Sequence, residues 1–576
     1  MVGLKASTAV VSLCLAALPA FAKDPINTMV PMPDGTRLMT LVLLPDGQGP
    51  FPAIVVRTPY GLPTPPSGPV VLEDDAETDA ILATWAPVLE RGYAVVQQNT
   101  RGRGGSEGLD MLFQTDRADG AALAEWLVDQ PWSDGTFRIT GDSADGFAGY
   151  LMAAERPAGL TGAFFQVSCA NLQKLGVVRR TGGLQMETLA PWIIQQAGES
   201  GQDNLTDIVE RGVDLEKAAG QGEALFGQLF GGEVGALINR PLTEMEPNVA
   251  LQPFWRDFIS EEGYAARAEY FDAAGDIDVP ITHVGLWQDT FVDCTIDAFQ
   301  RASGEQSLIV MNGTHYDIDD AEVWQSSGLE NAFLDWLDGN TAAAVRFEVE
   351  NAPSPMLIET PVWPPAGATA QRLYLSKEGL ARLAPSAGEL GQVVTDIAAP
   401  VATEGGRNLV ITAGTEMAAL PSEDEEVILQ IGEPMAADAI LVGPVTLDVT
   451  IRPDAQDADI VARLVAFNAE GQPRLILENL ARARYRDGRD NPSPTAPGVN
   501  VDLRIDLGHT AHYLSAGDQL GLILQGSNLP RWDIATGLDG DPSLDADARR
   551  ITTVVETNGT ARLEFATLAT DHRVGQ

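Results

Sequence analysis

The sequence is short of positive charge. Among its 576 residues, 37 Lys and Arg are set against 81 Asp and Glu, which gives a formal net charge of −44 at pH 7. A chain this acidic repels phosphate backbones and anionic lipid surfaces, so we expect no nucleic-acid partner. The charge identifies no particular substrate, because a solvated acidic surface in a salty or extracytoplasmic setting explains it equally well.

Long apolar runs are also missing, with one exception at the N-terminus. Lys5 precedes the run AVVSLCLAALPAFA, which ends in Ala-Phe-Ala at residues 20–22. This is the basic, apolar and A-x-A pattern of a cleavable secretory signal, and the run is too short to span a bilayer. We therefore expect cleavage after Ala22, removal of residues 1–22, and a periplasmic or secreted mature protein without a membrane anchor.

Cysteine is scarce, and one of the three cysteines falls in the predicted signal. Cys14 would be removed with it, which leaves Cys169 and Cys294 in the mature chain. Two cysteines in an oxidising compartment either pair or stay free, and the sequence alone leaves both outcomes open.

The chain is too long for one hydrophobic core, so we expect two or three domains. Residues 23–171 alternate strands with amphipathic helices, which predicts an α/β fold with a mostly parallel sheet covered on both faces. Residues 172–272 look helical and predict an inserted cap, after which the α/β pattern resumes over 273–344. Short alternating segments separated by Pro and Gly predict a β-sandwich over 345–576.

The segment FRITGDSADGFAGY, residues 137–150, reads as a buried strand, a glycine-flanked serine and a helix. Active sites of open α/β sheets lie at the carboxyl ends of strands, where Ser143 stands. A nucleophile there needs a tight turn with small neighbours, and the following helix directs its N–H groups at the reacting carbonyl. The usual pattern G-x-S-x-G fails because Asp145 occupies the second glycine position. The segment alone is therefore equally compatible with a helix cap.

A serine at its normal pKa is a poor nucleophile and needs a nearby base. Of the five histidines, His315 is the best placed, because it follows the apolar strand SLIVM, whereas His283 lies inside a strand and suits a structural role. The α/β-hydrolase order Ser, Asp, His places the orienting acid between them. Asp289 follows the strand that starts near Val279, and Asp293 is its nearest rival, with helix capping as the alternative role.

An oxyanion formed at Ser143 would need two hydrogen-bond donors. The backbone N–H of Ala144 is one candidate. Tyr60, in the loop after the early strand PAIVVRTPYG, offers a phenolic O–H beside the conformationally restricted Pro59. From its position alone, an ordinary loop aromatic is the favoured role of Tyr60.

Taken together, the motifs resemble the X-Pro dipeptidyl-peptidase and cocaine-esterase family of serine hydrolases. The matching segments are VVRTPYG, NTRGRGGSEG, AEWLVDQPWSDG, ITGDSADGFAGY, GLWQDTF, GTHYD and YLSAGDQLGLILQGSNLPRWD. They cover most of the mature chain in the family's order. The resemblance implies an α/β-hydrolase core, an inserted helical cap and a C-terminal jelly-roll β-sandwich.

The resemblance also implies roles for the candidate residues. In the family's elbow, G-x-S-Y-x-G, the second glycine stands one position later, where this chain has a glycine; Ser143 is then the nucleophile, Asp289 the acid and His315 the base. Tyr60 and the amide of Ala144 would hold the oxyanion. Two motifs depart from the family: G-W-Y-D becomes GLWQD, and P-W-x-H becomes NGTH.

Substrate-binding residues are expected beside the acid and the nucleophile. Trp287 and Phe291 flank Asp289, and we expect them to contact substrate. The family's α-amino-acid ester hydrolases carry acidic residues two and three positions after the acid, but Phe291 and Val292 stand here, which argues against that subgroup. Asp145 either attracts a cationic substrate or is simply stabilised by the dipole of the helix that it begins.

In the family's fold, the strands expected to carry Cys169 and Cys294 are neighbours. A disulfide between the two cysteines would join the two junctions of the cap with the core.

The sequence thus predicts an exported serine hydrolase that cleaves ester or amide bonds of small molecules or peptides through an acyl-enzyme. We expect no metal and no cofactor, and a homo-oligomer is compatible with the sequence. The alternative is a non-catalytic polymer- or glycan-binding protein on the same fold. Its β-sandwich would present aromatics such as Trp532, for which a core or domain contact is the other role.

Overall fold

The computed structural model describes residues 25–61, 82, 84–172, 182–189, 192, 240–244, 255–340, 344–417, 420, 426–557 and 559–570. The predicted signal segment, residues 1–22, lies outside these ranges. So do most of the helices predicted for the cap. Within the described ranges, no helix combines the length and apolarity that a membrane crossing requires.

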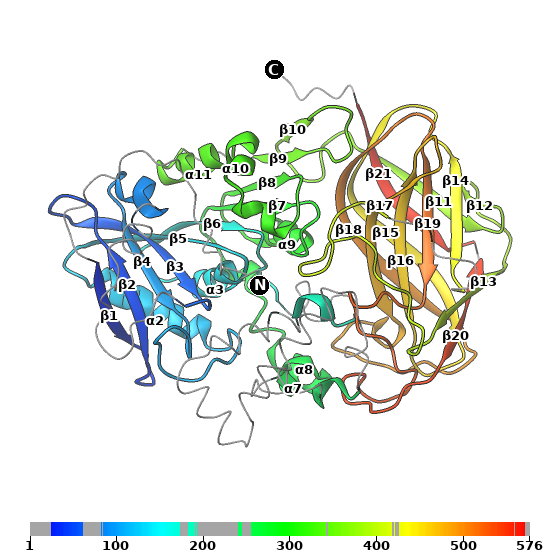
Figure 1. The fold of residues 1–576 in the computed structure, drawn as a ribbon, viewed down its shortest axis with the longest axis horizontal. Helices are drawn as coiled ribbons and strands as arrows, with labels where there is room; N and C mark the ends of the chain where they lie inside the picture. Colours follow the sequence, from blue (N-terminus) through cyan, green and yellow to red (C-terminus); the bar gives the residue numbers. More distant parts are fainter. Residues whose placement is uncertain are drawn as a thin grey trace, which may run out of the picture.

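Ten strands of the described chain form one sheet in the order β1-β2-β4-β3-β5-β6-β7-β8-β9-β10 (Figure 1). Neighbours from β4 through β9 run parallel, whereas the pairs β1–β2, β2–β4 and β9–β10 are antiparallel. The central strands are apolar on both faces, as a covered parallel sheet requires. The strands are β1 (Ile26–Pro31), β2 (Arg37–Leu43), β3 (Phe51–Thr58), β4 (Ala94–Asn99), β5 (Ser133–Asp142), β6 (Leu160–Gln166), β7 (Ile281–Leu286), β8 (Gln306–Met311), β9 (Val345–Glu348) and β10 (Leu357–Thr360).

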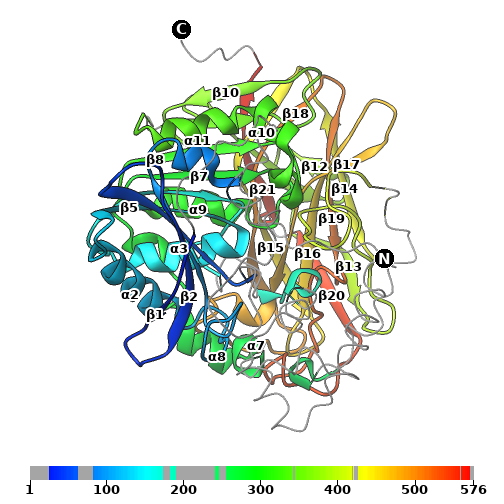
Figure 2. The same ribbon diagram turned by 60° about the vertical axis from the view of Figure 1, so that its left-hand side comes forward.

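Helices cover both faces of this sheet (Figure 2). On one face, a single apolar core includes α2 (Asp116–Val128), α3 (Ser143–Ala154) and part of α9 (Val292–Arg301). A second core, on the other face, includes the helical residues 84–89 and α11 (Leu329–Leu337). This arrangement is the α/β-hydrolase core that the sequence predicts.

The described parts of the predicted cap include several short helices. Residues 186–189 form helix, and α7 (Trp255–Ile259) and α8 (Glu261–Arg267) lie near its far end. Short 3-10 turns, η3 (Leu242–Glu244) and η4 (Ala274–Asp276), accompany them. In Figure 1, α7 and α8 lie below the space between the two larger parts of the molecule.

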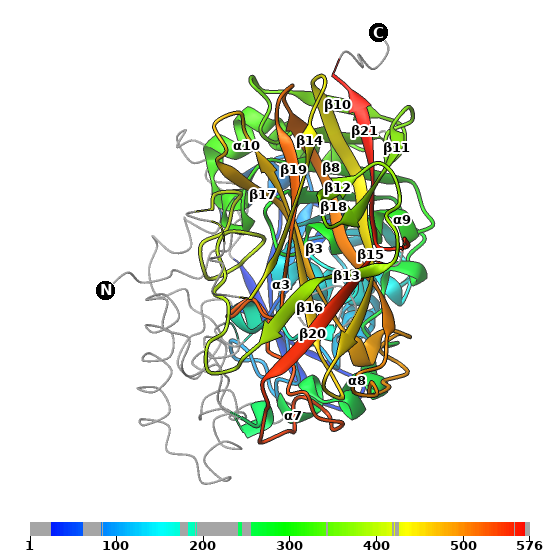
Figure 3. The same cartoon turned by 90° about the vertical axis from the view of Figure 1, so that its right-hand side faces the viewer.

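The C-terminal part is a sandwich of two antiparallel sheets (Figure 3). One sheet has seven strands and the other, β14-β19-β16-β17, has four, with a shared apolar core between them. The strands are β11 (Thr369–Ser376), β12 (Gly379–Ala381), β13 (Gly388–Thr395), β14 (Ile428–Pro434), β15 (Ala439–Pro453), β16 (Asp459–Phe467), β17 (Pro473–Arg482), β18 (Val501–Leu514), β19 (Gln519–Gln525), β20 (Ile551–Thr557) and β21 (Arg562–Ala569).

The boundary expected before residue 345 needs correction. β9 and β10 lie beyond it, yet β9 pairs in parallel with β8 and both strands extend the first sheet as far as Thr360. The α/β core therefore continues past the predicted boundary, and the sandwich begins with β11.

Candidate active site

Ser143 lies on a strained turn between β5 and α3. Its φ is +45°, a left-handed conformation that costs a non-glycine residue free energy and persists only when the surroundings impose it. A side chain at Gly141 would come within 2.7 Å of the Asp145 backbone, and one at Gly146 would collide with Ser168. The turn therefore depends on both glycines, and Gly146 takes the place of the glycine that the usual motif puts at Asp145.

The three residues predicted as a catalytic triad are brought together. His315 Nε2 lies 3.1 Å from Ser143 Oγ, and His315 Nδ1 lies 2.7 Å from Asp289 Oδ1. Asp289 follows β7 and His315 follows β8, so all three stand at carboxyl ends of parallel strands. Both Asp289 and His315 are buried. The arrangement lets His315 accept the Ser143 proton while Asp289 holds the imidazole in one orientation.

Carboxylates around His315 favour its protonated form. Burial lowers the pKa of His315, but the charge and hydrogen bond of Asp289, with the charges of Asp142 and Asp319, outweigh that effect and raise the pKa overall. Burial and the charge of Asp319 raise the pKa of Asp142 to about 7, while His315 opposes the shift. An imidazolium formed during the reaction would thus be stabilised by its surroundings.

Asp293, the rival acid, is held elsewhere. Its Oδ2 accepts a hydrogen bond from Arg407 Nη1 at 2.7 Å, and its Oδ1 accepts one from the backbone N–H of His509 at 2.7 Å. Both partners belong to the C-terminal part, so Asp293 joins α9 to the sandwich. Asp289 is the acid that contacts His315.

His283 has the structural surroundings expected of it. Its Nδ1 lies 2.8 Å from the Tyr150 hydroxyl, and its Nε2 lies 2.7 Å from Gln306 Oε1. Burial lowers the pKa of His283 to about 4, so the ring is neutral at pH 7.

Tyr60 also lies at the nucleophile. Burial, with the charge of Asp145, raises the pKa of its hydroxyl above the usual value, against the lowering effect of Trp192 and Ser143. The phenol therefore keeps its proton and can donate it in a hydrogen bond. Ala144, whose backbone N–H is the second predicted donor, follows Ser143 and lines the adjoining pocket.

An apolar pocket, with about 360 Å³ of empty space that is partly open to solvent, lies beside Ser143. Phe291 forms part of its wall, with its ring centroid 5.1 Å from that of Phe147 and 5.4 Å from that of His315. The other described wall residues, besides Ser143 and Ala144, are Leu112, Phe113, Phe147, Leu172, Thr188, Leu189, Trp192 and Leu409. Sequence reasoning missed this set, because its members come from separate loops, the cap and the sandwich and share no local motif.

Two residues expected to bind substrate do not line this pocket. Trp287 is fully buried, donates its indole N–H to the Glu348 carbonyl at 2.7 Å, and packs its ring 5.7 Å from that of Trp363. The Trp287 side chain of the GLWQD motif therefore packs into the apolar core that it shares with Trp363 and does not face the pocket. Asp145 is also buried, and it is not among the described residues that line the pocket.

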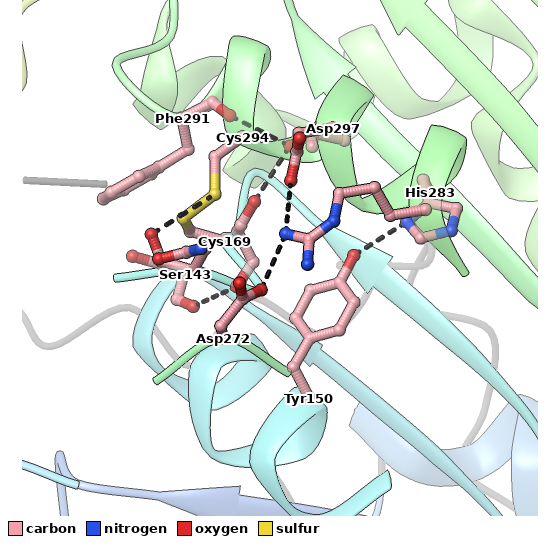
Figure 4. Close-up of a disulfide and its surroundings, with 12 residues drawn as sticks. Ser143, Tyr150, Cys169, Asp272, His283, Phe291, Cys294 and Asp297 are labelled. Atoms are coloured by element: carbon pink, nitrogen blue, oxygen red, sulfur yellow. Dashed lines mark hydrogen bonds and ion pairs between the residues drawn. A yellow bond between two sulfur atoms is a disulfide. The ribbon is translucent and has the colours of Figure 1, made fainter. Parts of the chain in front are cut away.

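Cys169 and Cys294 form a disulfide with their Cα atoms 5.1 Å apart, as the resemblance implies (Figure 4). Cys294 lies in the first turn of helix α9 and not on a strand, which corrects the expected position. The Ser168 hydroxyl, one residue before Cys169, donates to the Ser143 carbonyl at 2.7 Å. The disulfide thus fixes α9 to the segment that supports the strained serine.

Comparison with known proteins agrees with this geometry. The sequence pattern of the X-Pro dipeptidyl-peptidase (S15 family) matches residues 34–317, and that of the X-Pro dipeptidyl-peptidase C-terminal non-catalytic domain matches residues 337–563. The chain belongs to this family. It is therefore a hydrolase, built from the family's catalytic part and a β-rich C-terminal part. Its similarity to cocaine esterase from Rhodococcus sp. (strain MB1 Bresler) is 23% identity over 557 residues, or 88% of this chain and 91% of that protein.

Solved structures of similar fold span nearly the whole chain. An α-amino acid ester hydrolase superposes with a TM-score of 0.72 at 18% identity, covering 94% of this chain and 96% of its own. An aminopeptidase from a marine sediment Thaumarchaeota archaeon superposes with a TM-score of 0.69 at 18% identity, covering 96% of this chain and 99% of its own. A CocE/NonD family hydrolase from Staphylococcus aureus superposes with a TM-score of 0.65 at 15% identity, covering 94% of this chain and 93% of its own. At these identities the likeness establishes the fold alone.

Proposed function

We propose that this protein is an exported serine hydrolase that cleaves carboxylic esters through an acyl-enzyme. The observation that carries the proposal is the line of contacts Ser143–His315–Asp289 at the edge of an apolar pocket. The predicted signal segment and the Cys169–Cys294 disulfide support export, because disulfides persist in oxidising compartments.

In the proposed reaction, Ser143 Oγ attacks the ester carbonyl while His315 Nε2 takes the hydroxyl proton. Asp289 stabilises the resulting imidazolium. Tyr60 and the Ala144 amide donate hydrogen bonds to the oxyanion of the tetrahedral intermediate. His315 then returns the proton to the leaving alcohol, the ester C–O bond breaks, and water releases the acid from Ser143 by the same steps.

The pocket favours a neutral apolar acyl group. Its described lining is aliphatic and aromatic apart from Ser143 and Thr188, with no carboxylate to receive an ammonium group. Against the described lining, a dipeptide substrate with a free N-terminus would bury its ammonium without a carboxylate partner, which is costly. The relative named cocaine esterase is consistent with ester cleavage.

The alternative of a non-catalytic polymer-binding protein has less support. A binding protein has no need of a serine, a histidine and an acid within hydrogen-bonding distance. Trp532, the aromatic considered as part of a binding platform, is 1% exposed and packs in the interior.

A substrate panel tests the proposal. p-Nitrophenyl esters of neutral aliphatic and aromatic acids are compared with Xaa-Pro p-nitroanilides, each with the wild type and the Ser143→Ala variant. We expect kcat/KM for the best ester to exceed that for any Xaa-Pro anilide by at least about 100-fold, because burying an unpaired ammonium costs several kcal/mol. Faster cleavage of the anilides would reverse the proposed substrate class, and cleavage retained in Ser143→Ala would exclude the nucleophile.

A further inference from the structure

We propose that Glu187 is a specificity-determining residue that holds Leu409 in the wall of the acyl pocket. Leu409 belongs to the C-terminal part of the chain, yet it lines the pocket beside Ser143. An apolar pocket selects acyl groups by its size and shape, so the position of Leu409 bears on which esters fit. The inference rests on the proposed function, in which this pocket receives the acyl group.

The carboxylate of Glu187 contacts the segment that carries Leu409. Its Oε2 accepts hydrogen bonds from the backbone N–H of Leu409 and from that of Val410, each at 3.0 Å. Its Oε1 accepts a hydrogen bond from the hydroxyl of the neighbouring Thr188. Because Thr188 and Leu409 both line the pocket, one carboxylate joins the cap side of the wall to the sandwich side.

Glu187 itself lies behind the wall. It is fully buried and is not among the described residues that line the pocket. Both of its carboxyl oxygens accept hydrogen bonds from the protein, as a buried carboxylate requires. The contacts of Glu187 therefore act on the shape of the pocket and leave its lining apolar.

The backbone that presents Glu187 is fixed to two other parts of the molecule. The backbone N–H of Glu187 donates to the carbonyl of Pro530 in the sandwich at 3.0 Å. Two residues earlier, Gln185 Oε1 accepts a hydrogen bond from Thr290 Oγ1 at 2.9 Å, and Thr290 directly follows Asp289. A positioning group needs such a rigid support, because a mobile carboxylate would not fix the residues that bind it.

Loss of the carboxylate should move Leu409. In Glu187→Ala the backbone N–H groups of Leu409 and Val410 lose their acceptor and need another partner, which water can supply. The segment should then turn toward solvent and the pocket should widen at Leu409.

Glutamine is the matched replacement. Burial raises the pKa of the Glu187 carboxyl, and the hydrogen bonds from Thr188, Val410 and Leu409 oppose the shift. A glutamine keeps one acceptor oxygen for the two backbone N–H groups, and its NH₂ group can donate to the Thr188 hydroxyl, which also accepts hydrogen bonds. Glu187→Gln should therefore preserve the contacts that Glu187→Ala removes.

The preference between a long and a short ester tests the inference. The measured quantity is the ratio of kcat/KM for p-nitrophenyl octanoate to that for p-nitrophenyl acetate, in the wild type, Glu187→Ala, Glu187→Gln, Leu409→Ala and Glu187→Ala/Leu409→Ala. We expect Glu187→Ala to raise this ratio about tenfold, the value of one or two methylenes in an apolar site, and Glu187→Gln to stay near the wild type. The ratio is independent of the fraction of active protein, so a general loss of stability does not change it.

The double variant decides whether Glu187 acts through Leu409. If it does, Glu187→Ala changes the ratio little once residue 409 is alanine. Independent effects, which multiply to about 100-fold in the double variant, would overturn the inference, and so would equal ratios for Glu187→Ala and Glu187→Gln. Should Glu187→Ala not fold, Glu187→Met fills the same space without carboxylate oxygens and takes its place in the cycle.

Xaa-Pro p-nitroanilides, measured on the same variants, separate this inference from the proposed function. Ester cleavage that depends on Ser143, with a ratio that Glu187→Ala leaves unchanged, would overturn the role of Glu187 alone. If Glu187→Ala lowered kcat/KM only for the anilides, Glu187 would be a receptor for their ammonium group, and the proposed preference for neutral acyl groups would fail as well. A wild type without ester cleavage would overturn both proposals.

Discussion

His315 Nδ1 lies 2.7 Å from Asp289 Oδ1, and this contact couples the proposed base to a buried carboxylate. The Asp289 carboxylate raises the pKa of His315 against the lowering effect of burial. His315 accepts a proton only when it is neutral, so kcat/KM should rise with pH through the His315 pKa. The low-pH part of this profile, its acid limb, therefore reports the His315 pKa as Asp289 sets it.

Asp289→Asn removes the charge that raises the His315 pKa. We expect kcat to fall by about 10⁴-fold, because the imidazole loses its orienting partner, and the remaining acid limb to move to lower pH. Measurement of kcat/KM against pH for wild type and variant checks both effects. Asp293→Asn is the matched comparison; an equal loss of activity there would contradict the assignment of the acid.

Leu409 brings the sandwich to the wall of the pocket. Leu409→Ala enlarges the pocket, so esters with longer or bulkier acyl groups should gain in kcat/KM relative to short ones by about tenfold, the usual value of one or two methylenes in an apolar site. The comparison uses a series of p-nitrophenyl esters of increasing chain length. Leu383→Ala, at a position of the same domain that is 82% exposed, should leave the preference unchanged. If both variants changed the preference for acyl chain length, the effect of Leu409→Ala would not come from the pocket wall.

The Cys169–Cys294 disulfide closes a loop of 125 residues that contains the cap. Replacing both cysteines by serine should lower the free energy of unfolding by about 2–5 kcal/mol, because the unfolded chain regains the freedom that the cross-link removes. Denaturant unfolding with and without reductant measures the effect, and reductant should destabilise only the wild type. Thiol labelling of the unreduced, denatured mature protein should find no reactive cysteine; two reactive thiols would rule the disulfide out.

His283 should make the fold sensitive to acid. Its pKa is lowered to about 4 in the folded protein, below the usual 6.5, so the unfolded state binds the proton first as pH falls. The stabilisation that neutral His283 gives to the folded state is complete above pH 6.5. It is lost between about pH 6.5 and 4, by up to about 3 kcal/mol. The difference in unfolding free energy between wild type and His283→Gln should therefore shrink over that range. A difference independent of pH would contradict the buried neutral imidazole.

The meeting of Ser143, Asp289 and His315 at one place could be predicted because each follows a strand that its own sequence reveals. Ser143 directly follows β5, Asp289 and His315 come shortly after the ends of β7 and β8, and the ends of parallel strands meet at one edge of the sheet. The pocket wall could not be predicted in this way. Leu112 and Leu409 are apolar loop residues whose sequences carry no sign that they converge on one cavity.

The sequence-based errors arise where one position decides which way a side chain faces. Trp287 directly follows β7, where successive side chains point to opposite faces. A shift of one residue there decides whether the side chain faces the pocket or packs into the core on the other side. The sequence comparison with the family predicts a strand at Cys294, whereas α9 already begins at Val292. β9 and β10 are only four residues long, so their pattern does not distinguish the last strands of one sheet from the first of the next.

The central claim is that Ser143 is the nucleophile of a serine hydrolase, and covalent labelling tests it most directly. Wild type, Ser143→Ala and His315→Ala are treated with a fluorophosphonate probe, which reacts with activated serines, and the modified peptide is identified by mass spectrometry. We predict one label, on Ser143, in the wild type, none in Ser143→Ala, and strongly slowed labelling in His315→Ala. A label that persists in Ser143→Ala at the wild-type rate would contradict the account.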